Sequence, residues 1–223
     1  MLPLKDDNPT RTLPFVTIGL IAVNAAVYIH MVLLGPIDVE GFVAEYALVP
    51  AGFFGGAVGA ASVGRASILT SMFMHGGLLH IGGNMLFLWI FGDNVEDRIG
   101  HVRFLLFYLA CGLAAAFAHM LGDPSSSTPM IGASGAVSGV LGAYMLLFPG
   151  ARVLTLVFVF LMWVPAALVI GVWITVQILS SMESYGTGHT GIAWTAHIGG
   201  FFAGMAIVLL MGGKGRGGGR YWR

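Results

Sequence analysis

The chain has 223 residues, of which 57% are hydrophobic and only 9% are charged, and its mean hydropathy is +0.88. A soluble domain of this length carries about 25% charged residues, so the composition excludes a soluble globular protein and indicates an integral membrane protein. The formal net charge is zero, which gives no indication of a nucleic-acid partner. The single cysteine, Cys111, lies in an apolar stretch and cannot form an internal disulfide.

Six apolar stretches approach the roughly 20 residues that a helix needs to cross a bilayer. They predict an all-α membrane protein with spans near residues 13–34, 78–95, 102–121, 131–148, 164–180 and 192–211. No small-residue cleavage site follows a short apolar core near the N-terminus. The first stretch is therefore expected to be a retained span and not a signal peptide.

The connections between these spans differ in character. Residues 37–77 form a long, apolar and glycine-rich connection that we expect to lie partly at the membrane interface. Because Pro165 interrupts a long apolar stretch, residues 153–163 are expected to form a short or interfacial segment ahead of the fifth span. Residues 182–191 are rich in Gly, Ser and Thr and are predicted to be a loop.

The basic residues indicate the orientation, because they concentrate in cytoplasmic loops. Nine of the ten lie on the side of the two termini, namely Lys5, Arg11, Arg98, Arg103, Arg152, Lys214, Arg216, Arg220 and Arg223. We therefore predict six spans with both termini in the cytoplasm. The predicted organisation is a cytoplasmic N-terminal segment (1–12), a six-span domain (13–211) and a disordered Gly/Arg-rich cytoplasmic tail (212–223).

Four polar residues on three spans share one depth near the outer membrane face. They are His80 and Asn84 on the second span, Ser134 on the fourth and His197 on the sixth. Taken singly, each has an ordinary explanation, since a membrane serine usually packs or bonds back to its own helix and Asn84 alone fits a bridge between helices. Polar groups are costly in lipid, however, and usually face a partner or a water-filled cavity. Their common depth therefore predicts a single site.

Small residues provide a way to bring these spans together. His197, Gly200 and Gly204 lie on one face of the sixth span. Gly135 and Gly139 form a GxxxG pair on the fourth span, and such pairs let membrane helices approach closely. Spans four and six are therefore expected to touch, with the hydroxyl of Ser134 within hydrogen-bond reach of His197, as an activated serine requires.

The second span supplies hydrogen-bond donors to the same site. His80 and Asn84 lie four residues apart on one helical face. Together with unpaired backbone N–H groups at the start of the fourth span, they are suited to hold the oxyanion of a tetrahedral intermediate. No carboxylate lies near the outer end of spans two, four or six, so a serine–histidine dyad fits better than a triad.

These motifs resemble the rhomboid family of intramembrane serine proteases. The matching residues are Gly132-Ala133-Ser134-Gly135 for the family's GxSG, Ala196-His197-Ile198-Gly199-Gly200, His75-x4-His80-x3-Asn84, and Glu96-x-Arg98 followed by Gly100. The resemblance extends over about residues 12–211. GxSG alone is common, but the motifs in this order on these spans are specific.

The resemblance implies a six-helix rhomboid-like bundle with Ser134 as the nucleophile and His197 as the general base. It implies an oxyanion hole of His80, Asn84 and the Ser134 backbone N–H, with Gly132, Gly135 and Gly200 in support. Family members often have an aromatic residue one turn after the serine, stacked on the base. Here that position is Ser138, so another group must orient His197.

The resemblance also implies the substrates and the partners. Single-span membrane proteins would be cut near the outer membrane face, with residues 182–191 and the fifth span acting as lid and lateral gate. We expect a bilayer environment, a bacterial plasma membrane, and no cofactor, metal or nucleic acid. The alternatives are an inactive rhomboid-like protein that binds membrane helices, although such relatives typically lack the serine or histidine, and a transporter, which would need mid-membrane ionisable residues.

Overall fold

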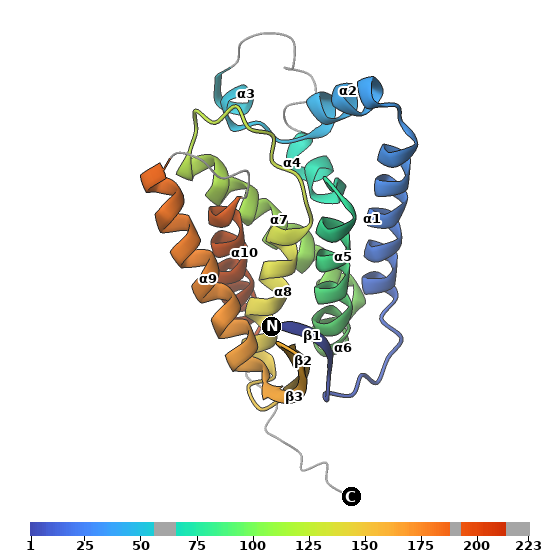
Figure 1. Ribbon diagram of the computed structural model, residues 1–223. Helices are drawn as coiled ribbons and strands as arrows, with labels where there is room; N and C mark the ends of the chain where they lie inside the picture. Colours follow the sequence, from blue (N-terminus) through green and yellow to red (C-terminus); the bar gives the residue numbers. More distant parts are fainter. Residues whose placement is uncertain (56–65, 188–192, 213–223) are drawn as a thin grey trace, which may run out of the picture.

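A bundle of helices makes up most of the chain in the computed structural model, which describes residues 1–55, 66–187 and 193–212 (Figure 1). Its long helices are α1 (Phe15–Leu33), α7 (His101–Gly122), α8 (Ser134–Leu147), α9 (Ala166–Thr187) and α10 (Trp194–Leu210). Their bounds agree with the predicted spans to within a few residues, except that α9 continues further. By length and composition α1, α7 and α9 can cross a membrane, whereas α8 and α10 are shorter apolar helices.

The predicted second span is one long helical segment with an irregular middle. It consists of α5 (Leu78–Phe87), a π-helical turn η2 (Leu88–Gly92) and α6 (Asp93–Ile99). The helix ends at Gly100, whose φ of 88° is a left-handed conformation that glycine adopts without strain. The helical segment therefore begins where the predicted span begins and continues beyond its predicted end at Val95 to Ile99.

A three-stranded antiparallel sheet at one end of the bundle corrects the all-α prediction (Figure 1). Its strands are β1 (Leu2–Asp6), β2 (Arg152–Val157) and β3 (Phe160–Pro165), with β2 in the centre. In β2 the buried residues Val153 and Thr155 alternate with more exposed ones, which is the periodicity of a strand. The N-terminal segment, predicted as a separate cytoplasmic piece, therefore pairs with residues 153–163, which were expected to be a short or interfacial segment.

Short helices fill much of the long connection after α1. They are α2 (Pro36–Tyr46), α3 (Pro50–Gly55), α4 (Ser67–Thr70) and the 3-10 turn η1 (Ser71–Phe73). The loop prediction for residues 182–191 is wrong up to Thr187, because α9 continues that far. The rest of that loop, Arg65 and the tail residues 213–223 lie outside the described residues.

Glycines allow α8 and α10 to pack with their backbones in contact, as predicted for spans four and six. A Cβ atom placed on Gly200 would lie 2.0 Å from the carbonyl oxygen of Gly135, and one on Gly204 would lie 2.0 Å from that of Gly139. On the other side of α8, a Cβ on Gly139 would meet the Cβ of Cys111 on α7 at 2.4 Å. This three-helix contact leaves no room for larger side chains and fixes the relative positions of α8 and α10.

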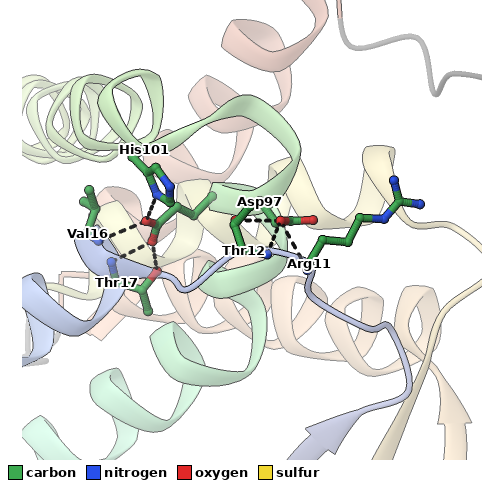
Figure 2. A network of polar contacts seen from close by, with 7 residues as sticks. Arg11, Thr12, Val16, Thr17, Asp97 and His101 are labelled. Atoms are coloured by element: carbon green, nitrogen blue, oxygen red, sulfur yellow. Dashed lines mark hydrogen bonds and ion pairs between the residues drawn. The ribbon is translucent and has the colours of Figure 1, made fainter.

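Carboxylates on α6 hold the start of α1 at the sheet end of the molecule (Figure 2). The buried Glu96 accepts hydrogen bonds from the N–H of Val16 (2.9 Å), and from the N–H (2.8 Å) and hydroxyl (2.7 Å) of Thr17. His101 contacts the same carboxylate at 2.5 Å. Because the first N–H groups of a helix lack partners within it, Glu96 acts as a cap supplied by another helix, where negative charge is favourable.

Asp97, the next residue on α6, extends this contact to the segment ahead of α1 (Figure 2). Its carboxylate accepts hydrogen bonds from the N–H and the hydroxyl of Thr12 at 2.9 and 2.7 Å, and from the N–H of Arg11 at 3.3 Å. The two adjacent carboxylates thus fix both the direction in which the chain enters α1 and the position of α1 against α6.

Candidate active site

Ser134 is the first residue of α8, and the opposite end of that helix leads into strand β2 of the sheet. The residue two positions earlier, Gly132, has a φ of 127°, which other residues rarely adopt. A Cβ on Gly132 would also lie 2.7 Å from Nε2 of His80. Glycine at this position therefore allows both the turn into α8 and the close approach of the His80 ring.

His197 on α10 is hydrogen-bonded to Ser134. Its Nε2 lies 2.7 Å from Oγ of Ser134, although the two residues are 63 positions apart in the sequence. Both side chains are half-buried. The hydroxyl donates to Nε2 when the proton of the imidazole is on Nδ1, which is the arrangement in which a histidine can remove the proton of a serine nucleophile.

The other nitrogen of His197 contacts a residue that is not among those predicted from the sequence. Nδ1 lies 2.6 Å from Oε1 of Gln177, a buried side chain on α9. The rings of Trp173 on α9 and Trp194 on α10 lie 5.9 and 6.1 Å from the imidazole, centroid to centroid. A signal was present in the sequence, because Gln177 is a polar residue within an apolar span and such residues usually have a partner.

Ser138, one turn after Ser134, is fully buried, and its hydroxyl has no hydrogen-bond partner within the described part of the chain. Because Ser138 has no aromatic ring, another group was expected at the imidazole of His197. Gln177 and the two tryptophans make these contacts.

His80 and Asn84 lie on α5, across from the serine. Asn84 is buried and its Nδ2 donates to Nε2 of His75 at 3.0 Å, which leaves the second N–H of the amide available. The N–H of Gly76 lies 3.5 Å from Nδ1 of His80. This weak contact favours the tautomer in which Nε2 of His80 carries the proton and can donate it. His75 belongs to the same sequence motif. It accepts the hydrogen bond from Asn84 and packs edge-on against His80, with 5.0 Å between the ring centroids.

The start of α8 contributes backbone donors. The first hydrogen bond along this helix runs from the N–H of Val137 to the carbonyl of Ala133, 3.0 Å. The N–H groups of Ser134, Gly135 and Ala136 therefore have no acceptor within the helix, as helix geometry requires. They lie next to the serine hydroxyl, where a developing oxyanion would form.

Ser134, His197, His80, Asn84 and the first residues of α8 line one cavity of about 450 Å³, whereas Ser138 and His75 lie outside its lining. Each residue predicted for the site lies in its walls except Gly200, which packs behind Gly135. Gln177 and Trp173 also line the cavity. Leu79, Phe87, Met130 and Trp194 add apolar surface. No group of three or more His, Cys, Asp or Glu side chains suited to a metal ion occurs in the described ranges. The arrangement has the components of acyl-transfer chemistry: a hydroxyl, a base bonded to it, and several N–H donors.

The fold and the cavity define a class of protein: an integral, multi-pass helical membrane protein with a hydrogen-bonded serine and histidine in an apolar cavity. The model of the rhomboid domain family matches residues 64–214. The chain belongs to the rhomboid family.

Similar proteins come from bacteria and from mitochondria. The chain is 33% identical to rhomboid protease GluP of Bacillus subtilis over 145 residues, which are 65% of this chain and 26% of GluP. It is 37% identical to the mitochondrial rhomboid protein 1 of Saccharomyces cerevisiae over 98 residues, 42% of this chain and 28% of that protein. It is 33% identical to the human presenilin-associated rhomboid-like protein over 87 residues, 38% of this chain and 23% of the relative. The matched segments thus span about a quarter of these relatives.

Proposed function

We propose that this protein is an intramembrane serine endopeptidase that cleaves the transmembrane segments of single-span membrane proteins with a Ser134–His197 dyad. The observation that carries the proposal is the 2.7 Å hydrogen bond between Ser134 Oγ and His197 Nε2 at a cavity that also holds N–H donors. The membership of the chain in a family that includes a named protease supports it.

In the proposed reaction, each of these groups has a chemical role. Ser134 Oγ attacks the scissile carbonyl carbon while His197 Nε2 takes the hydroxyl proton. The negative charge that develops on the carbonyl oxygen is stabilised by the Ser134 backbone N–H, the Nε2–H of His80 and the free N–H of Asn84. When the peptide bond breaks, His197 gives its proton to the leaving amine. Water, deprotonated by His197, then hydrolyses the acyl-enzyme.

The proposed membrane arrangement has six spans, formed by α1, the segment α5–η2–α6, and α7 to α10, with both termini in the cytoplasm. The distribution of the basic residues supports this orientation. The sheet would then lie at the cytoplasmic face and the site toward the outer face of a membrane such as the bacterial plasma membrane. A helix of 14 residues such as α8 is about 21 Å long, shorter than the roughly 30 Å hydrocarbon core, which is consistent with a serine below the membrane surface.

The test is cleavage of a single-span reporter protein by the purified enzyme in liposomes. Wild type is expected to cut the reporter and to react with a fluorophosphonate probe, whereas Ser134→Ala and His197→Ala do neither. Ser138→Ala is the matched control, because it removes a hydroxyl one turn away that makes no hydrogen bond to any described residue. Equal cleavage by wild type and Ser134→Ala would reject the proposal. Binding of the reporter by wild type without cleavage would support an inactive helix-binding protein instead.

A further inference from the structure

Gln177 lies at a position that decides which nitrogen of His197 carries the proton. The imidazole bridges two partners: Ser134 Oγ at 2.7 Å from Nε2 and Gln177 Oε1 at 2.6 Å from Nδ1. A neutral imidazole has one donor and one acceptor nitrogen. Only with the proton on Nδ1 does Nε2 present a lone pair to the serine hydroxyl.

The amide of Gln177 is itself oriented. Its Nε2 donates to the backbone carbonyl of Trp173, one turn earlier on α9, at 3.4 Å. Because this bond fixes the NH2 group away from the histidine, the carbonyl oxygen of the amide faces Nδ1. An oxygen can only accept, so the amide selects the tautomer with Nδ1 protonated. Gln177 is also buried, and a hydrogen bond in a low-dielectric environment is electrostatically stronger than one in water.

The contact joins two helices. Gln177 and Trp173 lie four residues apart on one face of α9, and both contact the imidazole of His197 on α10. In Figure 1 α9 lies at the edge of the bundle beside α10, and its side chains Leu168, Val172, Val176 and Leu179 are exposed. The orientation of the base therefore depends on an outer helix and not on the α8–α10 contact alone.

We infer that Gln177 is a positioning residue of the Ser134–His197 dyad, whose side-chain oxygen accepts the Nδ1–H of His197 and keeps Nε2 directed at the serine hydroxyl. This inference rests on the proposed function. Gln177 takes the position that an orienting aspartate has in serine–histidine–aspartate enzymes. The amide differs from aspartate because it carries no charge, so it fixes the tautomer and the ring orientation without stabilising the imidazolium by a full negative charge.

The first test compares Gln177→Met with Gln177→Glu. Methionine has a similar volume and cannot accept the Nδ1–H bond. Gln177→Met is expected to lower kcat and the rate of fluorophosphonate labelling about 10- to 100-fold and to leave KM nearly unchanged. This effect is smaller than the roughly 10⁴-fold loss on replacing an orienting aspartate. Glutamate keeps an acceptor and should restore the labelling rate. Its carboxylate favours the protonated imidazole, so the acid limb of the pH profile of kcat/KM should move to higher pH.

A matched control lies on the same helix. Thr175→Val changes an exposed residue whose hydroxyl donates to the carbonyl of Gly171 within α9, and it should leave kcat, KM and the labelling rate as in wild type. If wild type cleaves and labels, Ser134→Ala does not, and Gln177→Met matches wild type in kcat and pH profile, the inference about Gln177 is wrong while the proposed function stands. If wild type itself neither cleaves nor labels, the proposed function fails.

A second measurement does not depend on activity or on the stability of the variants. The 15N chemical shifts of the His197 side chain in the wild-type protein report which nitrogen is protonated. The proton is expected on Nδ1 at neutral pH. A proton on Nε2 would overturn the inference, because the oxygen of Gln177 would then have no proton to accept.

Discussion

Gly200 on α10 lies against the backbone of Gly135 on α8 so closely that a Cβ atom there would come within 2.0 Å of the Gly135 carbonyl oxygen. Ser134 immediately precedes Gly135, and His197 lies one turn before Gly200 on the same helix. The close helix contact and the 2.7 Å bond between serine and histidine are therefore parts of one arrangement. Anything that separates these backbones also lengthens the bond between the two side chains.

The substitution Gly200→Ala tests this relationship. The added methyl group has to displace backbone atoms, so we expect a loss of about 1–3 kcal/mol in the free energy of unfolding and a strongly reduced rate of reporter cleavage. Gly171→Ala is the matched control, since a Cβ at that helical position meets nothing within 4 Å. Alanine there should stabilise the helix by up to about 1 kcal/mol. Thermal unfolding in detergent and reporter cleavage measure both effects, and full activity in Gly200→Ala would contradict the expectation.

The donors on α5 give a second prediction. If His80 and Asn84 hold the oxyanion, replacing either by alanine should lower kcat by about 10²- to 10³-fold, equivalent to about 2.7–4 kcal/mol, with little change in the melting temperature. His75→Phe should lower kcat as well, because Asn84 loses the acceptor that orients its amide. Steady-state kinetics on the reporter provide the measurement. Full activity in the His80→Ala, Asn84→Ala double variant would exclude the oxyanion role.

The predicted spans and the meeting of the fourth and sixth spans follow from local patterns. Hydrophobic length marks a helix in lipid, and Gly135, Gly139, Gly200 and Gly204 mark where two helices approach. These signals are contained within each helix, so the sequence alone is enough to read them.

The sheet and the role of Gln177 depend on partners distant in the sequence. Strand β1 pairs with β2 across about 150 residues, and an apolar hairpin next to a membrane span has the composition of a helical span. Gln177 faces His197 only because α9 and α10 pack side by side. Nothing in the sequence around either residue specifies that contact, although a lone polar residue in an apolar span indicates that a partner exists.

Glu96 gives a third prediction, which concerns stability and not catalysis. Removing its carboxylate in Glu96→Ala leaves the N–H groups of Val16 and Thr17 without their acceptor. Since each unsatisfied buried donor costs about 1–3 kcal/mol, the loss in unfolding free energy should be on the order of 3 kcal/mol. Glu96→Gln keeps an acceptor oxygen and should cost less. Glu40→Ala, at an exposed position on α2, should leave the unfolding transition unchanged. An equal, small effect in all three variants would show that the α1 cap does not depend on Glu96.

Asp6, at the end of β1, gives a prediction on pH dependence. The pKa of its carboxyl is raised from 3.8 to about 6, mainly by burial; the hydroxyl of Tyr144, which donates to it at 2.5 Å, lowers the pKa, and the charge of Asp7 raises it. Asp93 on α6 also interacts with Asp6 through its charge. Because the folded pKa exceeds the unfolded value, the contribution of Asp6 to stability is complete below about pH 4 and is lost as the pH rises through about 6.

The variant Asp6→Asn isolates this contribution, because asparagine keeps an acceptor for Tyr144 and does not ionise. Relative to wild type, its unfolding free energy should increase between about pH 4 and pH 6.5 and then stay constant. Asp38→Asn, at an exposed position on α2, serves as the control. Chemical unfolding at a series of pH values gives the differences. A difference between Asp6→Asn and wild type that does not vary with pH would mean that Asp6 titrates alike in the folded and unfolded chain.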